Sequence, residues 1–267
     1  MIQQPKPAGW RSTLVRVLLF CLGSAIVLAT VSRLTQGFPK AWTDPLSIIV
    51  ATILTFGLTL LFLRWEGLNL GDVGLVPGSR SIFRVATGFL IGLILASLQV
   101  GGVMLFGHLK LVLNPEFSFP YILSAFLLYF LVASREELAF RAYPLRGLNY
   151  VLGPWTAQLI VAIVFSLEHV LGGMSWMQAF LGSGIGAILF GVAALRTRGI
   201  ALPVGLHAAW NFGQWVFGFK NVPGIWEAVV ENGYGPKVTR TGMIIYIVIM
   251  SLAIVVIYRF PVKNNVK

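Results

Sequence analysis

Charged residues are scarce in this 267-residue sequence, at 11%, whereas soluble domains carry about 25%. Hydrophobic residues make up 57% of the chain, so the composition excludes an ordinary water-soluble domain. We predict an all-α, polytopic transmembrane helix bundle in which residues 1–267 form a single integral membrane domain. The net charge of +11 does not indicate nucleic-acid binding, because the basic residues are scattered singly at the ends of apolar runs.

Cysteine is almost absent, because Cys21 is the only one. A single cysteine excludes an internal disulfide and a metal site built from several thiolates, so we expect Cys21 to pack as a small apolar residue. Histidine is nearly as rare, with three in the chain. A histidine inside an apolar run of such a sequence therefore indicates a specific role.

Long apolar runs, by contrast, are abundant. A helix needs about 20 mainly apolar residues to cross a bilayer, and eight runs meet this length: 13–33, 45–64, 82–107, 119–146, 154–171, 174–195, 200–219 and 241–260. The first run resembles a signal peptide, but no small-residue cleavage site follows it, so we expect it to remain as a span. Lysine and arginine are more frequent on the side of the N-terminus, which predicts that both termini are cytoplasmic.

Adjacent carboxylates interrupt the fourth run, although a charge at mid-bilayer costs about 2.5–3.5 kcal/mol. Side chains four residues apart share a helix face, so Glu137 should pair with Arg141. Glu136 lies on a different face of the helix from Glu137. The residue four positions after it is Phe140, which cannot form an ion pair. A buried carboxylate without a neighbouring cation takes up a proton readily. We therefore predict that Glu136 is a general base and that Glu137 and Arg141 support it. Arg135 would either pair with a carboxylate or extend its guanidinium group toward the membrane surface.

Two of the three histidines lie in later runs. His207 and Asn211 are four residues apart and should present an imidazole and an amide on one face, and Phe165 and His169 share a face in the same way. Counting about 1.5 Å per residue from the helix ends places these groups and the glutamate pair in one cavity, open to the cytoplasmic side. Glu168 could be catalytic, but it points away from His169, so we expect it to make a polar contact between helices or to lie near water.

These residue types suit the hydrolysis of an amide bond. Glu136 would take a proton from water with the help of His169, while His207 and Asn211 would donate hydrogen bonds to the developing oxyanion. Two histidines and a glutamate can also bind zinc, although the HExxH spacing of common zinc proteases is absent. We expect a reaction without a metal or another cofactor, and the zinc-dependent version stays open.

Three motifs in sequence order resemble the CPBP family, the CAAX proteases and bacteriocin-processing enzymes that are also called Abi. The segment EELAFR fits E-E-x-x-x-R, FSLEH fits F-x-x-x-H, and HAAWN fits H-x-x-x-N, within a core from 120 to 215. The resemblance implies an intramembrane endopeptidase in which Glu136 and His169 activate water, and His207 and Asn211 form the oxyanion hole. It also implies a membrane-associated peptide or protein substrate, processed in the CAAX or the leader-peptide and bacteriocin manner.

Other function classes remain open at this point. A non-catalytic scaffold of the same family would bind and regulate a partner. A proton-coupled transporter would use Glu and His as a relay, although it would ordinarily show internal repeats. A rhomboid-type serine protease would need G-x-S-G, whereas residues 181–184 read LGSG. Short loops without further domains are typical of a prokaryotic protein, so we expect a prokaryotic plasma membrane.

Overall fold

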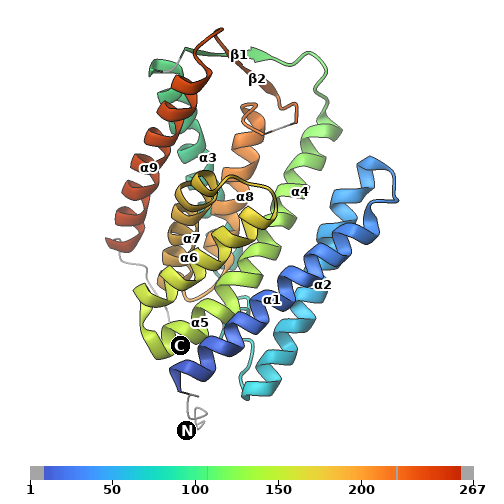
Figure 1. Cartoon of the computed structure of the whole chain (residues 1–267), viewed down its shortest axis with the longest axis vertical. Helices are drawn as coiled ribbons and strands as arrows, with labels where there is room; N and C mark the ends of the chain where they lie inside the picture. Colours follow the sequence, from blue (N-terminus) through green and yellow to red (C-terminus); the bar gives the residue numbers. More distant parts are fainter. Residues whose placement is uncertain (1–8, 107, 221, 260–267) are drawn as a thin grey trace.

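The protein folds as a bundle of long helices (Figure 1). The computed structural model describes residues 9–106, 108–220 and 222–259. Its elements in chain order are α1 (Trp10–Thr35), α2 (Lys40–Glu66), α3 (Ser81–Phe106), β1 (Leu109–Leu113), α4 (Phe119–Glu137), the π-helix η1 (Leu138–Ala142), α5 (Tyr143–Leu152), α6 (Pro154–Leu171), the π-helix η2 (Gln178–Ser183), α7 (Gly184–Thr197), α8 (Ala201–Val216), β2 (Trp226–Val230) and α9 (Gly235–Arg259). The all-α fold class is confirmed. The predicted span ends at 107 and 260 and both termini lie outside the described residues.

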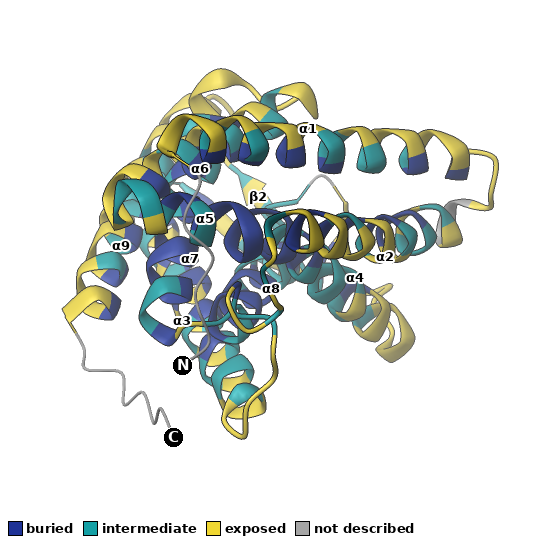
Figure 2. Ribbon diagram, turned by 90° about the horizontal axis from the view of Figure 1, so that it is seen from below, coloured by how far each residue is buried: buried dark blue, intermediate teal, exposed yellow. Residues whose placement is uncertain are grey.

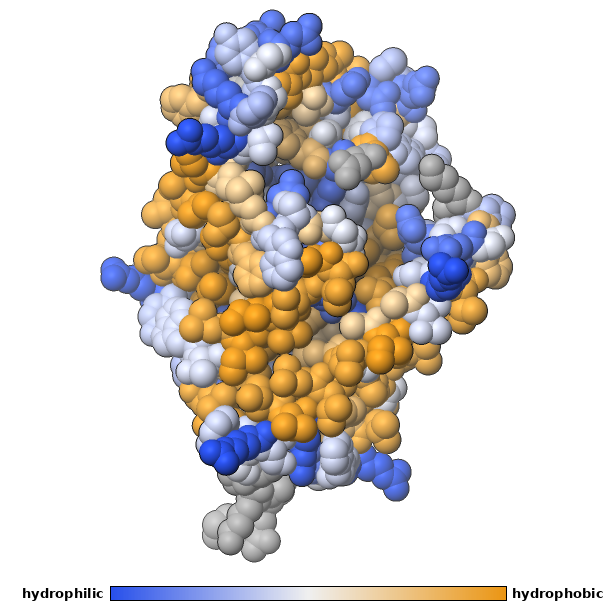
Figure 3. Space-filling model, in the orientation of Figure 1, coloured by the Kyte–Doolittle hydropathy of each residue, from blue (hydrophilic) through white to orange (hydrophobic). Residues whose placement is uncertain are grey.

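Among the described residues, six helical segments are long and apolar enough to cross a membrane: α1, α2 from Trp42, α3, α6, η2 with α7, and α9. The other two predicted spans correspond to α4 and α8. α4 carries Arg135, Glu136 and Glu137 at its C-terminal end, and α8 has only 16 residues. Figure 3 shows hydrophobic residues across the middle of the face in view and hydrophilic residues toward its two ends, as expected for a surface in contact with lipid.

The predicted span 119–146 is not one continuous α-helix. α4 ends at Glu137, and η1 joins it to α5. Pro144 lies in the first turn of α5 and has no backbone N–H to donate to the preceding turn, which disfavours an uninterrupted α-helix. The π-helical turn follows directly after the glutamate pair, and such turns are frequent at functional sites.

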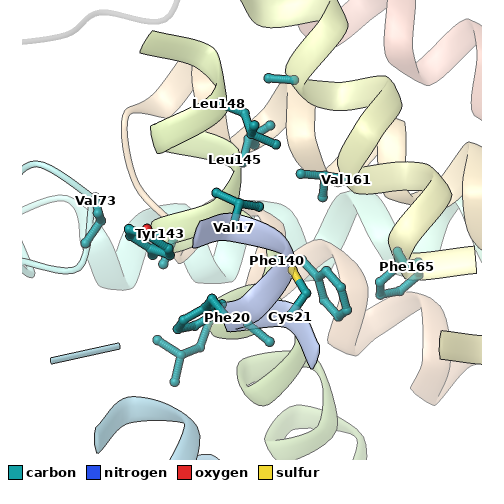
Figure 4. Packing of buried hydrophobic residues seen from close by; sticks show 14 of the residues in the cluster. Val17, Phe20, Cys21, Val73, Phe140, Tyr143, Leu145, Leu148, Val161 and Phe165 are labelled. Carbon is teal, nitrogen blue, oxygen red and sulfur yellow. The ribbon is translucent and has the colours of Figure 1, made fainter. Parts of the chain in front are cut away.

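α7 lies between two hydrophobic clusters, and Figure 2 shows that it is largely buried. The first cluster includes residues of α1, α2, η1, α5, α6 and α7, among them Cys21 and Phe140 (Figure 4). Cys21 is 6% exposed, which confirms its predicted role in packing. The second cluster joins α3, α7, α8 and α9 and includes the fully buried Leu189, Leu206 and Met250.

α3 and α8 pack backbone to backbone along a line of small residues, which we call the glycine seam. It consists of Gly88, Gly92 and Ala96 on α3, and Gly205, Ala209 and Gly213 on α8. A Cβ at Gly92 would overlap the carbonyl oxygen of Leu206, and a Cβ at Gly205 would overlap that of Val85. Small residues spaced by four allow such close approach between membrane helices. The seam therefore sets the position of α8, which carries His207 and Asn211.

A short β-ribbon, which the sequence analysis did not predict, caps one end of the bundle. β1 pairs antiparallel with β2, with Leu109 opposite Val230 and Leu113 opposite Trp226. Figure 1 shows the ribbon at the end of the bundle opposite α5. The ribbon thereby holds residues 217–220 and 222–225, which follow α8, close to the C-terminal end of that helix.

Candidate active site

Glu137 is the buried member of the glutamate pair, with a side chain that is 0% exposed. Its Oε1 lies 3.3 Å from Arg141 Nη1, so the ion pair predicted from the spacing is present. The same oxygen accepts a hydrogen bond from His207 Nδ1 at 2.9 Å. Glu137 therefore orients the imidazole on α8, a role that its position in the sequence did not reveal.

Glu136 is the more accessible member, with a side chain that is 17% exposed. Its Oε2 lies 3.7 Å from His207 Nε2, which is longer than a hydrogen bond, and it has no hydrogen-bond partner among the described residues. The expectation that Glu136 lacks a basic neighbour is wrong, because basic side chains from other helices lie close to it. His207 is the nearest, and His169 also lies within electrostatic range.

His169 is held by its own helix. Its Nδ1 lies 2.9 Å from the carbonyl oxygen of Phe165, one turn earlier, and their ring centroids are 4.4 Å apart. A carbonyl oxygen can only accept a hydrogen bond, so Nδ1 carries the proton. In the neutral ring Nε2 can then accept a hydrogen bond. Phe165 also lies under the guanidinium group of Arg141, 4.6 Å from its Cζ. It therefore packs between the supporting ion pair and His169.

Asn211 lies one turn beyond His207 on α8, as predicted. Its Oδ1 accepts a hydrogen bond from Lys220 Nζ at 3.0 Å. Burial lowers the pKa of Lys220, and the negative charge of Glu136 opposes that shift. The site thus includes a lysine that directly follows the predicted span 200–219.

Arg135 and Glu168 form a second ion pair beside the site. Arg135 Nη1 lies 2.6 Å from Glu168 Oε1, and Arg135 Nη2 donates to the carbonyl oxygen and Oγ of Ser24 at 3.1 and 3.0 Å. This arrangement joins α4, α6 and α1. It agrees with the predicted polar contact of Glu168 and, of the two alternatives for Arg135, with pairing to a carboxylate.

Two residues of the site were missed by the sequence analysis. Phe190 on α7 stacks on His207, with ring centroids 4.4 Å apart and an interplanar angle of 16°. Phe190 belongs to an apolar run in which nothing distinguishes it from other core residues. Lys220 directly follows a predicted span, where a basic residue ordinarily marks the headgroup region. Only its contacts in the fold identify it as part of the site.

The arrangement can support acid–base chemistry on a carbonyl compound. Glu136 on α4 provides a carboxylate, and His169 on α6 provides an imidazole with a free nitrogen. His207 and Asn211 on α8 provide hydrogen-bond donors. Within the described ranges, no group of three or more His, Cys, Asp or Glu side chains is arranged to hold a metal ion.

Residues 118–213 match the model of the Rce1-like family, described as type II CAAX prenyl endopeptidase Rce1-like. The matched segment contains Glu136, His169, His207 and Asn211, and it ends before Lys220. A comparison with curated proteins finds no match. The family match confirms the resemblance drawn from the three motifs. Together with the apolar helices, it supports a membrane-embedded endopeptidase.

Proposed function

We propose that this protein hydrolyses peptide bonds of a membrane-associated peptide or protein by a glutamate-dependent mechanism. The substrate would be processed in the CAAX or the leader-peptide and bacteriocin manner. The observation that carries the proposal is the pairing of a partly exposed carboxylate, Glu136, with an imidazole, His207, whose far side is bound by the fully buried Glu137. Similarity to the Rce1-like family supports the reaction class.

In this mechanism Glu136 removes a proton from a water molecule, and the resulting hydroxide attacks the carbonyl carbon of the scissile bond. His169, whose Nε2 can accept a hydrogen bond, helps to orient that water. The carbonyl oxygen becomes an oxyanion. Glu136 then transfers its proton to the nitrogen of the leaving peptide as the carbon–nitrogen bond breaks, which returns the carboxylate to its starting state.

His207 and Asn211 would stabilise the oxyanion. His207 Nδ1 donates to Glu137, so donation from Nε2 as well requires the imidazolium form of the ring. Removing one donor of this kind costs about 3–4 kcal/mol of transition-state stabilisation, so both side chains would contribute measurably to the rate.

Glu136→Gln is the test. Purified protein in detergent would be incubated with a pool of membrane peptides, prenylated and unprenylated, and the products read by mass spectrometry. We expect the wild type to cleave, and we expect Glu136→Gln to lose about 10²–10⁴-fold in rate, the usual contribution of a general base. Glu116→Gln, which changes an exposed acid in the loop before α4, is the matched control and should cleave like the wild type.

The same assay separates the alternatives. Full activity of Glu136→Gln would show that the proposed base is wrong. Activity that chelation removes and zinc restores would move the mechanism to a metal, whereas we propose that cleavage survives chelation. Absence of cleavage in every sample would favour a non-catalytic scaffold.

We propose that the protein lies in a prokaryotic plasma membrane with both termini cytoplasmic. The excess of lysine and arginine on the side of the N-terminus supports this orientation.

A further inference from the structure

The chain reverses direction at the C-terminal end of α8. Gly218 adopts a left-handed conformation with φ of 76°. The N–H of Phe219 donates to the carbonyl oxygen of Gln214 at 2.8 Å, and the N–H of Gly218 donates to that of Trp215 at 3.0 Å. These two bonds define a Schellman motif, which ends a helix and turns the chain back. The reversal carries Lys220 back along α8, to a residue nine positions earlier in the sequence.

The ribbon holds this reversal in place. A Cβ at Gly218 would lie 2.7 Å from the backbone nitrogen of Ala228 in β2, and a Cβ at Gly224 would overlap the carbonyl oxygen of Trp215 in α8. Gly218 is therefore in close backbone contact with β2, and Gly224 with α8. Lys220 lies two residues after Gly218, so its side chain starts near the C-terminal end of α8.

Lys220 is directed at the site and not at solvent. Its Nζ lies 3.0 Å from Asn211 Oδ1 and 5.6 Å from the ring centroid of Tyr129 on α4. It also lies within electrostatic range of Glu136. A lysine that merely marked the membrane surface would extend its ammonium group into the headgroup region, whereas this one is directed at the side chain proposed to bind the oxyanion.

The chemistry of the two groups decides what the contact does. An asparagine amide can turn either its oxygen or its nitrogen toward a ligand, and only the nitrogen end can donate to an oxyanion. An ammonium group has donors and no acceptor, so Lys220 can bind only the oxygen end. We propose that Lys220 is a positioning residue, which holds Asn211 Oδ1 and thereby turns the amide N–H groups toward the reacting carbonyl. This inference rests on the proposed endopeptidase function and concerns the orientation of one of its residues.

Lys220→Met is the first test, because methionine keeps an unbranched apolar stem and lacks the donor. We expect kcat to fall about 10- to 100-fold, as misplacement of a catalytic group does, with KM unchanged within about twofold. Lys220→Arg, which retains a donor, should recover most of the rate. Lys237→Met is the matched control, because Lys237 is an exposed lysine that binds His108, and it should not change the rate. An unchanged kcat in Lys220→Met would overturn the proposal.

A double-mutant cycle separates positioning from a general structural effect. Asn211→Ala alone should lower kcat about 10²–10³-fold, as loss of an oxyanion donor does. If Lys220 acts through Asn211, adding Lys220→Met to Asn211→Ala should lower kcat no further, because the two effects are then coupled. Losses that multiply in the double variant would mean that Lys220 acts independently of Asn211 and would overturn the proposal.

A measurement without turnover distinguishes failure of this inference from failure of the proposed function. The side-chain amide resonances of Asn211, identified by their loss in Asn211→Ala, can be followed by NMR in detergent micelles. We expect them to move toward the positions of a free amide in Lys220→Met and to stay in place in Lys220→Arg. Unchanged resonances in Lys220→Met would overturn the positioning role whatever the cleavage assay shows. A wild type that does not cleave would count against the proposed function alone.

Discussion

The two sides of α8 are held in different ways. Toward α3, the glycine seam brings the two backbones into direct contact, so that a Cβ on Gly92 or Gly205 would overlap a carbonyl oxygen of the partner helix. Around the candidate site, the contacts that hold α8 side chains are polar, because His207 donates to Glu137 on α4 and Asn211 accepts from Lys220 in the segment after α8. α8 thus carries the glycine seam on one face and polar groups of the candidate site on another face.

The two kinds of contact therefore have different effects on α8. Apolar burial drives helix association weakly in lipid, where close van der Waals packing is the main source of attraction. The seam therefore positions α8 as a rigid unit. The polar contacts then orient individual side chains on that unit, and each depends on a single hydrogen bond or ion pair. Changes at the seam should reduce stability, whereas changes on the polar side should also reduce the rate.

Glu137→Gln should have the largest effect on stability. It leaves the fully buried Arg141 with only the more distant charge of Glu136. Breaking a buried ion pair from one side costs about 3–5 kcal/mol of unfolding free energy, and the loss should be visible in detergent-based unfolding. Glu136→Gln is the matched control, because it changes the neighbouring acid and should cost less than about 1 kcal/mol. Equal stability losses in the two variants would contradict the assignment of separate roles.

Gly92→Ala should weaken the seam. The added methyl group would meet the carbonyl oxygen of Leu206 and would lie 2.7 Å from the Cβ of Ala209, so α3 and α8 must move apart. We expect a loss of about 1–3 kcal/mol in unfolding free energy, the usual cost of overpacking. Gly101→Ala tests the same change in the same helix at a position with no atom within 4 Å. It should cause no loss, and comparable losses at both positions would show that the seam is not specific.

Much of the fold could be predicted from the sequence, because a bilayer requires about 20 apolar residues per span and the apolar runs are long. The π-helical turn was missed because one extra residue in a helical turn leaves the composition unchanged, although Pro144 is a local signal. The seam has a clearer signal in the four-residue spacing of Gly88, Gly92 and Ala96. β1 and β2 have five residues each, which is too short to distinguish from a loop by pattern.

Side-chain pairs of the candidate site could be predicted within each helix, whereas individual contacts between helices could not. Spacing by four placed Glu137 beside Arg141, and His207 on the same side of α8 as Asn211, because helix geometry alone decides these pairs. The contact of Glu137 with His207 depends on the rotation and tilt of two helices, which one sequence does not reveal. Lys220 depends on a chain reversal, for which Gly218 is the local signal.

Phe190→Leu should have the smallest effect and tests whether packing also orients the polar side. Phe190 stacks on the His207 ring, and leucine fills much of its volume without the flat surface. We expect a loss of about 1 kcal/mol in stability and a two- to fivefold drop in kcat, roughly 0.5–1 kcal/mol in the barrier. Phe89→Leu, which removes aromatic contacts from α3 to Phe126 on α4 and to Phe212 on α8, should lower stability without changing kcat. If Phe190→Leu leaves kcat intact, the hydrogen bond from Glu137 alone holds His207. If both variants lower kcat equally, the two sides of α8 act as one unit.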